Sequence, residues 1–207
     1  MASFSLKSGL ELAVLLLLGC IASAQEDEDP LPISLDAESS SFDRKNGTVS
    51  FRGLRITQGD FIIRADEAIA SDLDFERSEW RFSGNIRVSI DSASIESSEA
   101  EATFESHELL VAELRGNPAV FQDANPERET AIRGGADRLQ YDNRTRTLRM
   151  TEGAWLNEGP NEFRGCDLIY DFEQEKITSG SSDCGEPVVI TILPPADDAG
   201  TNRPAEP

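Results

Sequence analysis

Apolar and polar residues alternate along short stretches of this chain, with an apolar residue at every second position. The pattern is clearest in 80–82 and 86–90, and it recurs around Val49, Leu148 and Val188. Alternation with a period of two is typical of β-strands that bury one face. Polar turn sequences separate the stretches, as in the Asn-Gly of 45–48, so we predict a succession of β-hairpins.

One segment, 97–114, has a composition that favours a helix. Its apolar residues Ala102, Phe104 and Leu109 do not keep the 3.6-residue spacing of a helix face. We therefore predict two strands in this segment, and no helix in the folded part of the chain.

A glycine closes the first alternating run of four successive units, at Gly53, Gly84, Gly116 and Gly153. The units are about 30 to 40 residues long, and self-similarity on that scale indicates a stacked array. A unit with one apolar face cannot bury it alone, so neighbouring units must share a core. Glycine at a strand bend avoids a Cβ clash, so each strand is predicted to cross there from one sheet to a facing sheet. The predicted fold class is all-β: an open two-sheet solenoid of stacked antiparallel strands.

Six short motifs span most of the chain between residues 33 and 194: TVSFRG at 48–53, IIRAD at 62–66, GNPAVF at 116–121, GADRLQYD at 135–142, LRMTEGAWL at 148–156 and VVITILP at 188–194. Taken in order, these motifs resemble the OstA-like (LptA-type) family of periplasmic lipopolysaccharide-transport proteins. The resemblance implies a twisted β-jelly-roll, V-shaped in section, that carries lipid A acyl chains in its interior. It also implies end-to-end assembly that bridges the inner and outer membranes.

The candidate interior consists of the apolar residues of the alternating strands. A dry, filled core is the ordinary interpretation of such a face, whereas the resemblance implies that it accommodates lipid. The candidates are Val49, Phe51, Ile56, Phe82, Ile86, Val88, Ile90, Phe121, Leu148, Met150 and Leu156.

The first strand, expected at 33–38, and the last, expected at 188–193, would be the free edges of an open array. The last strand carries no charge, so it lacks the usual protection against strand addition. We predict docking there, to copies of the chain or to proteins of the same fold, unless the terminal segments cover both edges. The resemblance implies an LptC-like inner-membrane adaptor and an LptD-like outer-membrane translocon as partners. The candidate docking residues are Ile33, Leu35, Val188, Ile190 and Ile192.

The composition of the chain excludes several classes of function. The 207 residues fit one domain, and the formal net charge of −20 argues against a nucleic-acid partner. The single histidine, His107, gives no basis for a catalytic triad or a histidine-rich metal site, and we expect an ordinary surface or strand residue. We therefore expect a non-enzyme without cofactor or metal, and an exported hydrolase is the weakest interpretation. A structural adaptor, or an LptC-like paralogue that joins envelope proteins by strand addition, is the alternative to a lipid carrier.

The N-terminus has the pattern of a cleaved export signal. An apolar run follows Lys7 and ends at a small-residue site, so we predict cleavage after Ala24 and a periplasmic location. Acylation at Cys20, or a retained anchor, are the alternatives. The expected divisions are a signal peptide at 1–24, a disordered lead-in at 25–32, a β-jelly-roll domain at 33–193 and a disordered tail at 194–207.

Two cysteines remain after such a cleavage, Cys166 and Cys184. An even pair in an exported chain indicates a disulfide, with two buried free thiols as the alternative. The bridge would close a loop of about 18 residues, which stabilises the fold by about 3 kcal/mol in the chain-entropy model.

Overall fold

The computed structural model describes residues 31–180, 185 and 187–193. The expected signal peptide, most of the expected lead-in, the tail and Cys184 lie outside the described residues. Within them every regular element is a β-strand, so the predicted fold class is confirmed. The strands are β1 (Ser34–Asp36), β2 (Ser39–Asp43), β3 (Thr48–Gln58), β4 (Phe61–Ala70), β5 (Arg77–Ile90), β6 (Ala93–Glu105), β7 (Glu108–Asp123), β8 (Ile132–Asp142), β9 (Thr147–Glu158), β10 (Asn161–Asp171), β11 (Lys176–Ser179) and β12 (Val189–Thr191).

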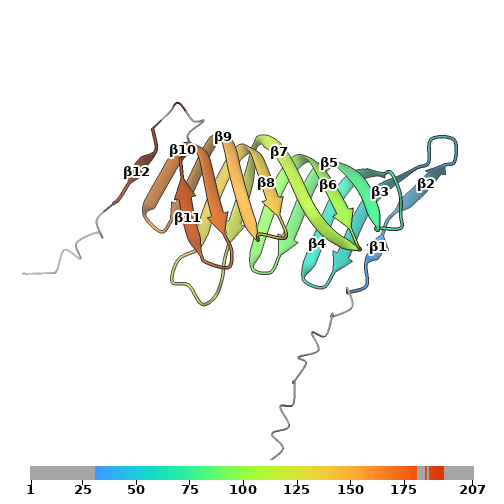
Figure 1. Cartoon of the computed structure of the whole chain (residues 1–207), viewed down its shortest axis with the longest axis horizontal. Helices are drawn as coiled ribbons and strands as arrows, with labels where there is room; N and C mark the ends of the chain where they lie inside the picture. The colour runs from blue at the N-terminus through green and yellow to red at the C-terminus, as the bar shows by residue number, and fades with distance from the viewer. Residues whose placement is uncertain (1–30, 181–184, 186, 194–207) are drawn as a thin grey trace, which may run out of the picture.

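The strands form one antiparallel sheet in which most strands pair with their neighbours in the sequence. The segment whose composition favours a helix holds the end of β6 and the start of β7, joined by a turn at Ser106 and His107, so the prediction of two strands is confirmed. The array runs along the long axis of the molecule, with β1 and β2 at one end and β11 and β12 at the other (Figure 1).

The long strands are bent near their middles, so the single sheet folds over into two walls. At one end, β1 pairs with the second half of β3 and β2 pairs with its first half. At the other end, β12 and β11 divide β10 in the same way. We call the strand halves that run from β1 to β12 the β1 wall, and those that run from β2 to β11 the β2 wall. The predicted two sheets are therefore the two walls of one continuous sheet.

The bends lie along one line, which we call the spine, and all four predicted glycines, Gly53, Gly84, Gly116 and Gly153, lie on it. The pairing of β5 with β6 shifts register between Ser83 and Ile86, and Gly84 lies inside this shift. Gly84 has φ +74°, and a Cβ there would lie 2.7 Å from the Asp66 carboxylate, so only glycine fits without strain. A glycine is required here because the backbone both turns and closely approaches β4.

The core lies between the walls, and both walls turn alternate side chains toward it. Trp80 of β5 stacks between Phe51 and Phe82, with ring centroids 5.7 and 5.9 Å away. Nearer the other end, Phe121 of the β1 wall faces Tyr170 of the β2 wall at 5.5 Å. Contact between rings from opposite walls shows that the fold brings the two apolar faces together.

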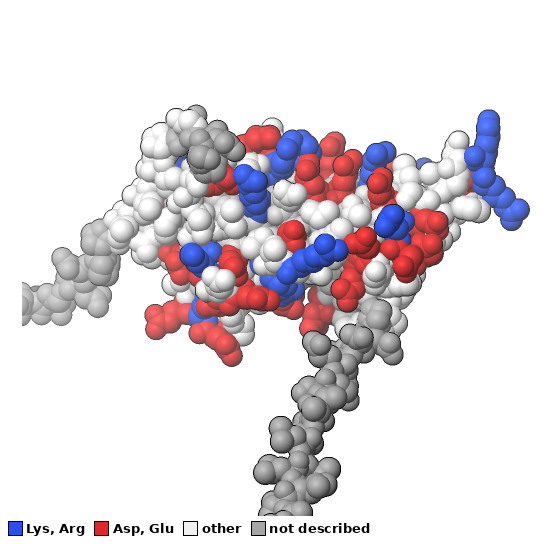
Figure 2. All heavy atoms as spheres, in the orientation of Figure 1, with Lys and Arg blue, Asp and Glu red and all other residues white. Residues whose placement is uncertain are grey.

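The outer faces carry charged side chains that pair across neighbouring strands. Arg87 of β5 contacts Glu96 of β6 at 2.6 Å, and Arg81 contacts Glu101 at 3.1 Å. Figure 2 shows acidic and basic side chains interleaved on one face of the molecule. Exposed pairs of this kind contribute at most about 1 kcal/mol each. Within the described part of the chain, no helix has the length and apolarity to cross a membrane.

Candidate functional site

All eleven predicted interior residues lie on the inward faces of the two walls. Their exposed fractions run from 0% at Ile56 to 8% at Phe51. Val88 and Phe121 belong to the β1 wall, whereas Phe82 and Met150 belong to the β2 wall. The location is as predicted, and whether lipid or only protein fills the interior stays a prediction.

The interior also contains large side chains that the sequence analysis did not select. Trp80, Phe104, Tyr141 and Tyr170 are each at most 1% exposed. Trp80 lies two positions before Phe82, so the same alternation could have identified it. Tyr170 gave a weaker signal, because Ile169 beside it is also apolar and interrupts the alternation of Leu168, Tyr170 and Phe172.

The walls meet again along the side opposite the spine, where their hairpin turns face each other. We call this side the mouth, and we call the side-chain contacts that cross it the polar seam. At the β1 end of the seam, the Gln58 side chain donates a hydrogen bond of 2.7 Å to the backbone carbonyl of His107. The His107 side chain is half exposed and lies 3.6 Å from Glu76, which agrees with the expected ordinary residue.

The middle of the seam is an ion pair between two turns. Arg146, in the β8–β9 turn, donates to the carboxylate of Asp91, in the β5–β6 turn. The same guanidinium donates a second hydrogen bond of 3.2 Å to the Tyr141 hydroxyl. Arg146 is therefore held between a surface carboxylate and the edge of the interior.

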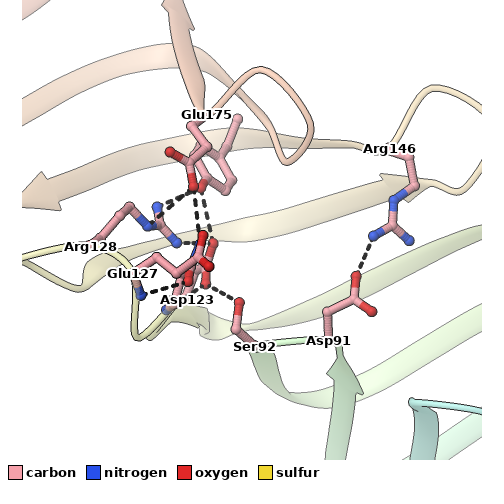
Figure 3. A network of polar contacts seen from close by, with 9 residues as sticks. Asp91, Ser92, Asp123, Glu127, Arg128, Arg146 and Glu175 are labelled. Atoms are coloured by element: carbon pink, nitrogen blue, oxygen red, sulfur yellow. Dashed lines mark hydrogen bonds and ion pairs between the residues drawn. The ribbon is translucent and has the colours of Figure 1, made fainter.

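The third part of the seam is a cluster around Asp123 at the end of β7 (Figure 3). Its carboxylate accepts hydrogen bonds from the Ser92 hydroxyl at 2.7 Å and from the Tyr170 hydroxyl at 3.0 Å. Arg128, from the β7–β8 loop, forms an ion pair with Asp123 and donates to the Tyr170 hydroxyl at 2.8 Å. Since Tyr170 belongs to the opposite wall, this cluster joins the two walls.

Glu175, in the β10–β11 turn, extends the cluster outward. Its carboxylate accepts a hydrogen bond of 3.2 Å from the Asn125 side chain and lies 3.6 Å from Nε of Arg128. The Arg128 side chain is 13% exposed and that of Glu175 is 46% exposed. The cluster thus extends from buried side chains at the interior to the half-exposed carboxylate of Glu175 at the surface.

The surroundings of the cluster shift the pKa values of two of its members. Burial raises the pKa of Asp123, but hydrogen bonds from Ser92, Arg128 and Tyr170 and the charge of Arg128 together lower it below the ordinary 3.8. Burial, followed by the charge of Asp123, raises the pKa of the Tyr170 hydroxyl. At neutral pH Asp123 is therefore a carboxylate and Tyr170 is the neutral donor that it needs.

A hollow of about 330 Å³ opens at the mouth between the first two seam contacts. Gln58, Asp91 and Arg146 line it, together with the apolar side chains of Ile90 and Leu109. Ile90 and Leu109 are buried core residues, so the hollow leads from solvent to the edge of the interior.

The strands at the two ends of the array are short. β1 covers only Ser34–Asp36, so the expected strand 33–38 is too long, because the chain leaves the β1 wall to form β2. Ile33 and Leu35 are half-buried and pack against the core. β12 holds Ile190, while Val188 and Ile192 flank it; Ile190 is 52% and Ile192 73% exposed. Within the described residues, neither β1 nor β12 has a second strand partner.

Cys166 of β10 is disulfide-bonded, as predicted. Cys184, the partner predicted for it, lies outside the described residues, so the pairing itself stays a prediction. Cys166 lies where the pairing of β10 with β9 shifts register.

The folded-over sheet, its apolar interior and its open ends define an all-β protein of the open jelly-roll class. The family model of the LptA/(LptD N-terminal domain) LPS transport proteins matches residues 67–176, more than half of the chain, and the chain belongs to this family. Among solved structures, LptH from Pseudomonas aeruginosa, described as the LptA homologous periplasmic component of the lipopolysaccharide transport device, is similar in fold. It is 17% identical, with a TM-score of 0.49 over 80% of this chain and 99% of its own. No curated protein matches the chain in sequence.

Proposed function

We propose that this chain carries lipopolysaccharide across the periplasm, with the acyl chains of lipid A held between its two walls. The observation that carries the proposal is the continuous apolar interior, to which both walls contribute along the length of the array. Membership of an LPS transport family supports it.

The physical chemistry of the interior suits acyl chains. Each CH₂ group moved from water into an apolar environment contributes about 0.8 kcal/mol, so long chains are held by area alone. The saccharide headgroup must remain outside, because burying unpaired hydroxyls costs several kcal/mol. Binding of this kind needs no catalytic group, cofactor or metal, so we propose a carrier and not an enzyme.

The ends of the array are the proposed docking surfaces. Backbone groups on the free sides of β1 and β12 can accept another strand, which is the usual mode of β-augmentation. Ile33 and Leu35 at one end, and Val188, Ile190 and Ile192 at the other, would contact the added strand. The proposed partners are a second copy, an LptC-like adaptor and an LptD-like translocon.

An exported location agrees with two features of the chain. The predicted signal peptide, with cleavage after Ala24, directs export. The disulfide at Cys166 is typical of an oxidising compartment such as the periplasm.

A structural adaptor with a dry core is the second candidate. The observation that favours it is the close packing of interior rings, such as Phe75 and Phe104 with centroids 5.0 Å apart. Such packing satisfies the apolar side chains without any lipid, and the chain would then serve only to join envelope proteins through its edges.

Photo-cross-linking separates the two candidates. A photoreactive amino acid at Phe82, which is 3% exposed, should form lipopolysaccharide adducts in cells if lipid occupies the interior. The matched control is Arg81, the neighbouring residue on the outer face of the same strand. Adducts at Phe82 and not at Arg81 support the carrier, and their absence at both positions supports the adaptor.

A further inference from the structure

A lipid with a saccharide headgroup poses a geometric problem for this fold. Its acyl chains would lie between the walls and its headgroup in solvent, so the part that links them must pass through the boundary of the interior. Continuous strands close the spine. The headgroup therefore has to leave through the mouth, where the polar seam joins the walls.

The turns on the β2-wall side of the mouth include one design used three times, in the β2–β3, β8–β9 and β10–β11 turns. Each begins with an aspartate, Asp43, Asp142 or Asp171. The carboxylate of this aspartate accepts hydrogen bonds from the backbone N–H groups two and three residues further on, at 2.8 to 3.2 Å. Local bonding of this kind fixes the turn without help from the fifth residue.

The fifth residue of each turn lies in the left-handed region of backbone space. It is Gly47 in the first turn, with φ +66°, but Arg146 in the second, with φ +51°, and Glu175 in the third, with φ +48°. Glycine adopts this conformation freely, whereas arginine and glutamate are strained in it. The chain therefore accepts strain at the two positions whose side chains cross the mouth, and uses glycine at the third.

Asp91, the partner of Arg146, is also left-handed, with φ +52°. Aspartate tolerates this conformation better than arginine does, so the strain at this contact lies chiefly at Arg146, and strain kept there points to a function for the contact. The hollow beside it gives access from solvent to the buried side chains of Ile90 and Leu109.

We propose that the Asp91–Arg146 pair is a gate in the mouth, which parts when a lipid with a saccharide headgroup enters and closes when the lipid leaves. The gate rests on the proposed function, since it presumes that acyl chains occupy the interior. On either side of the gate, the Gln58 contact and the cluster of Asp123, Arg128 and Tyr170 keep the two walls joined. An ion pair suits this role because partly solvated charges separate at low cost and attract each other again when the headgroup has passed.

The first test locks the gate. In an Asp91→Cys/Arg146→Cys variant, a short bismaleimide linker joins the two turns covalently across the mouth, because the Arg146 side chain spans a longer distance than a disulfide does. The control is Arg81→Cys/Glu101→Cys, which joins registered neighbours on the outside of one wall. The measurement is the rate at which each purified cross-linked variant takes up lipopolysaccharide labelled on its sugar. The uptake of a fluorescent fatty acid, whose small carboxylate needs no wide opening, is measured separately.

We expect the locked gate to slow lipopolysaccharide uptake by about tenfold or more while the control keeps the rate of the unmodified chain. Fatty-acid binding should stay the same in both. Uptake of lipopolysaccharide at an unchanged rate by the locked variant would overturn the gate but leave the carrier function standing. Binding of neither lipid by the unmodified chain would overturn the carrier function and the gate together.

The second test opens the gate without harming the fold. Arg146→Gly removes the contact and gives the turn the residue that the β2–β3 turn already has. We expect this variant to keep its melting temperature and to take up lipopolysaccharide about twofold to fivefold faster. The matched control is Glu152→Gly, at a residue that is also left-handed but lies at the spine, and it should leave uptake unchanged. Equal uptake by Arg146→Gly and the unmodified chain would contradict the proposal.

Discussion

The hydroxyl of Tyr170 donates a 3.0 Å hydrogen bond to the carboxylate of Asp123, although 47 residues separate the two in the sequence. Tyr170 belongs to the β2 wall and Asp123 ends a strand of the β1 wall. The bond therefore holds the folded sheet closed at a point far from any bend. Arg128 contacts both residues, so a change to one member of the cluster affects the other two.

Tyr170→Phe removes this hydroxyl and keeps the ring that packs on Phe121. Asp123 then loses one donor at a buried site, and we expect the free energy of unfolding to fall by about 1 to 2 kcal/mol. Urea denaturation measures the change. Ser98→Ala is the control, because it removes an exposed hydroxyl bonded to a backbone carbonyl and should cost less than about 0.5 kcal/mol. Equal losses of unfolding free energy in the two variants would show that the Tyr170 hydrogen bond stabilises the fold no more than an exposed hydrogen bond does.

Asp123 should make part of the stability depend on acidity. Its pKa in the fold lies below the ordinary 3.8, so its contribution is complete above that pH and is lost as the pH falls through the folded-state pKa. Protonation of many other carboxylates also changes stability in this range, so the informative quantity is a difference. The gap in unfolding free energy between the unmodified chain and Asp123→Asn should narrow below pH 3.8 and stay constant above it. A gap that is the same throughout would contradict the assigned pKa shift.

Val88→Ala tests whether the interior is filled by protein or open to lipid. Val88 is 3% exposed on the β1 wall, and we expect truncation to cost about 1 to 2 kcal/mol. Weaker lipid cross-linking at Phe82 with only this modest loss supports a lipid-lined interior. A larger loss of stability with unchanged cross-linking supports a dry core. Arg87→Ala, on the outer face next to it, is the control and should change neither.

Proline substitutions in β12 test the docking edge. In an antiparallel strand, successive N–H groups point to opposite sides, so one of Ile190 and Thr191 faces β10 and the other faces the free edge. Proline removes the N–H group at either position. We expect the outward-facing substitution to abolish self-association and partner capture in a folded protein, and the inward-facing one to detach β12. If assembly in gel filtration and pull-down survives both changes, β12 is not the docking surface.

The predicted Cys166–Cys184 bridge can be tested by thiol labelling. The denatured, unreduced protein should show no free thiol at either position, because the exported chain folds in an oxidising compartment. Replacing both cysteines by serine should lower the free energy of unfolding by about 3 kcal/mol. Stoichiometric labelling of Cys184 would exclude the pair.

The sequence predicts the walls well because burial alone decides which side of a strand faces inward. The alternation in 86–90 places Ile86, Val88 and Ile90 correctly, and the glycines at 84 and 116 mark bends. Local signals of this kind need no knowledge of which strands meet across the core.

The polar seam could not be predicted in the same way. Asp91 and Arg146 are ordinary residues of polar turns, and their contact depends on how far the sheet folds over and twists. Tyr170 and Asp123 likewise come together only in three dimensions. The seam leaves one signal in the sequence: arginine or glutamate stands at the turn position that glycine occupies at Gly47. This signal can be recognised only once the backbone angle of that position is known.

The contacts across the mouth join residues at nearly constant separations in the sequence: 49 for Gln58 and His107, 55 for Asp91 and Arg146, 47 for Asp123 and Tyr170, and 50 for Asn125 and Glu175. They therefore act like a row of three separate fasteners spaced along the molecule, because the contacts Asp123–Tyr170 and Asn125–Glu175 belong to one cluster. In an array whose units touch only their neighbours, one fastener can be undone while the others hold. A moving lipid would then need an opening only as wide as itself, and that opening could travel from one end of the chain to the other without unfolding it.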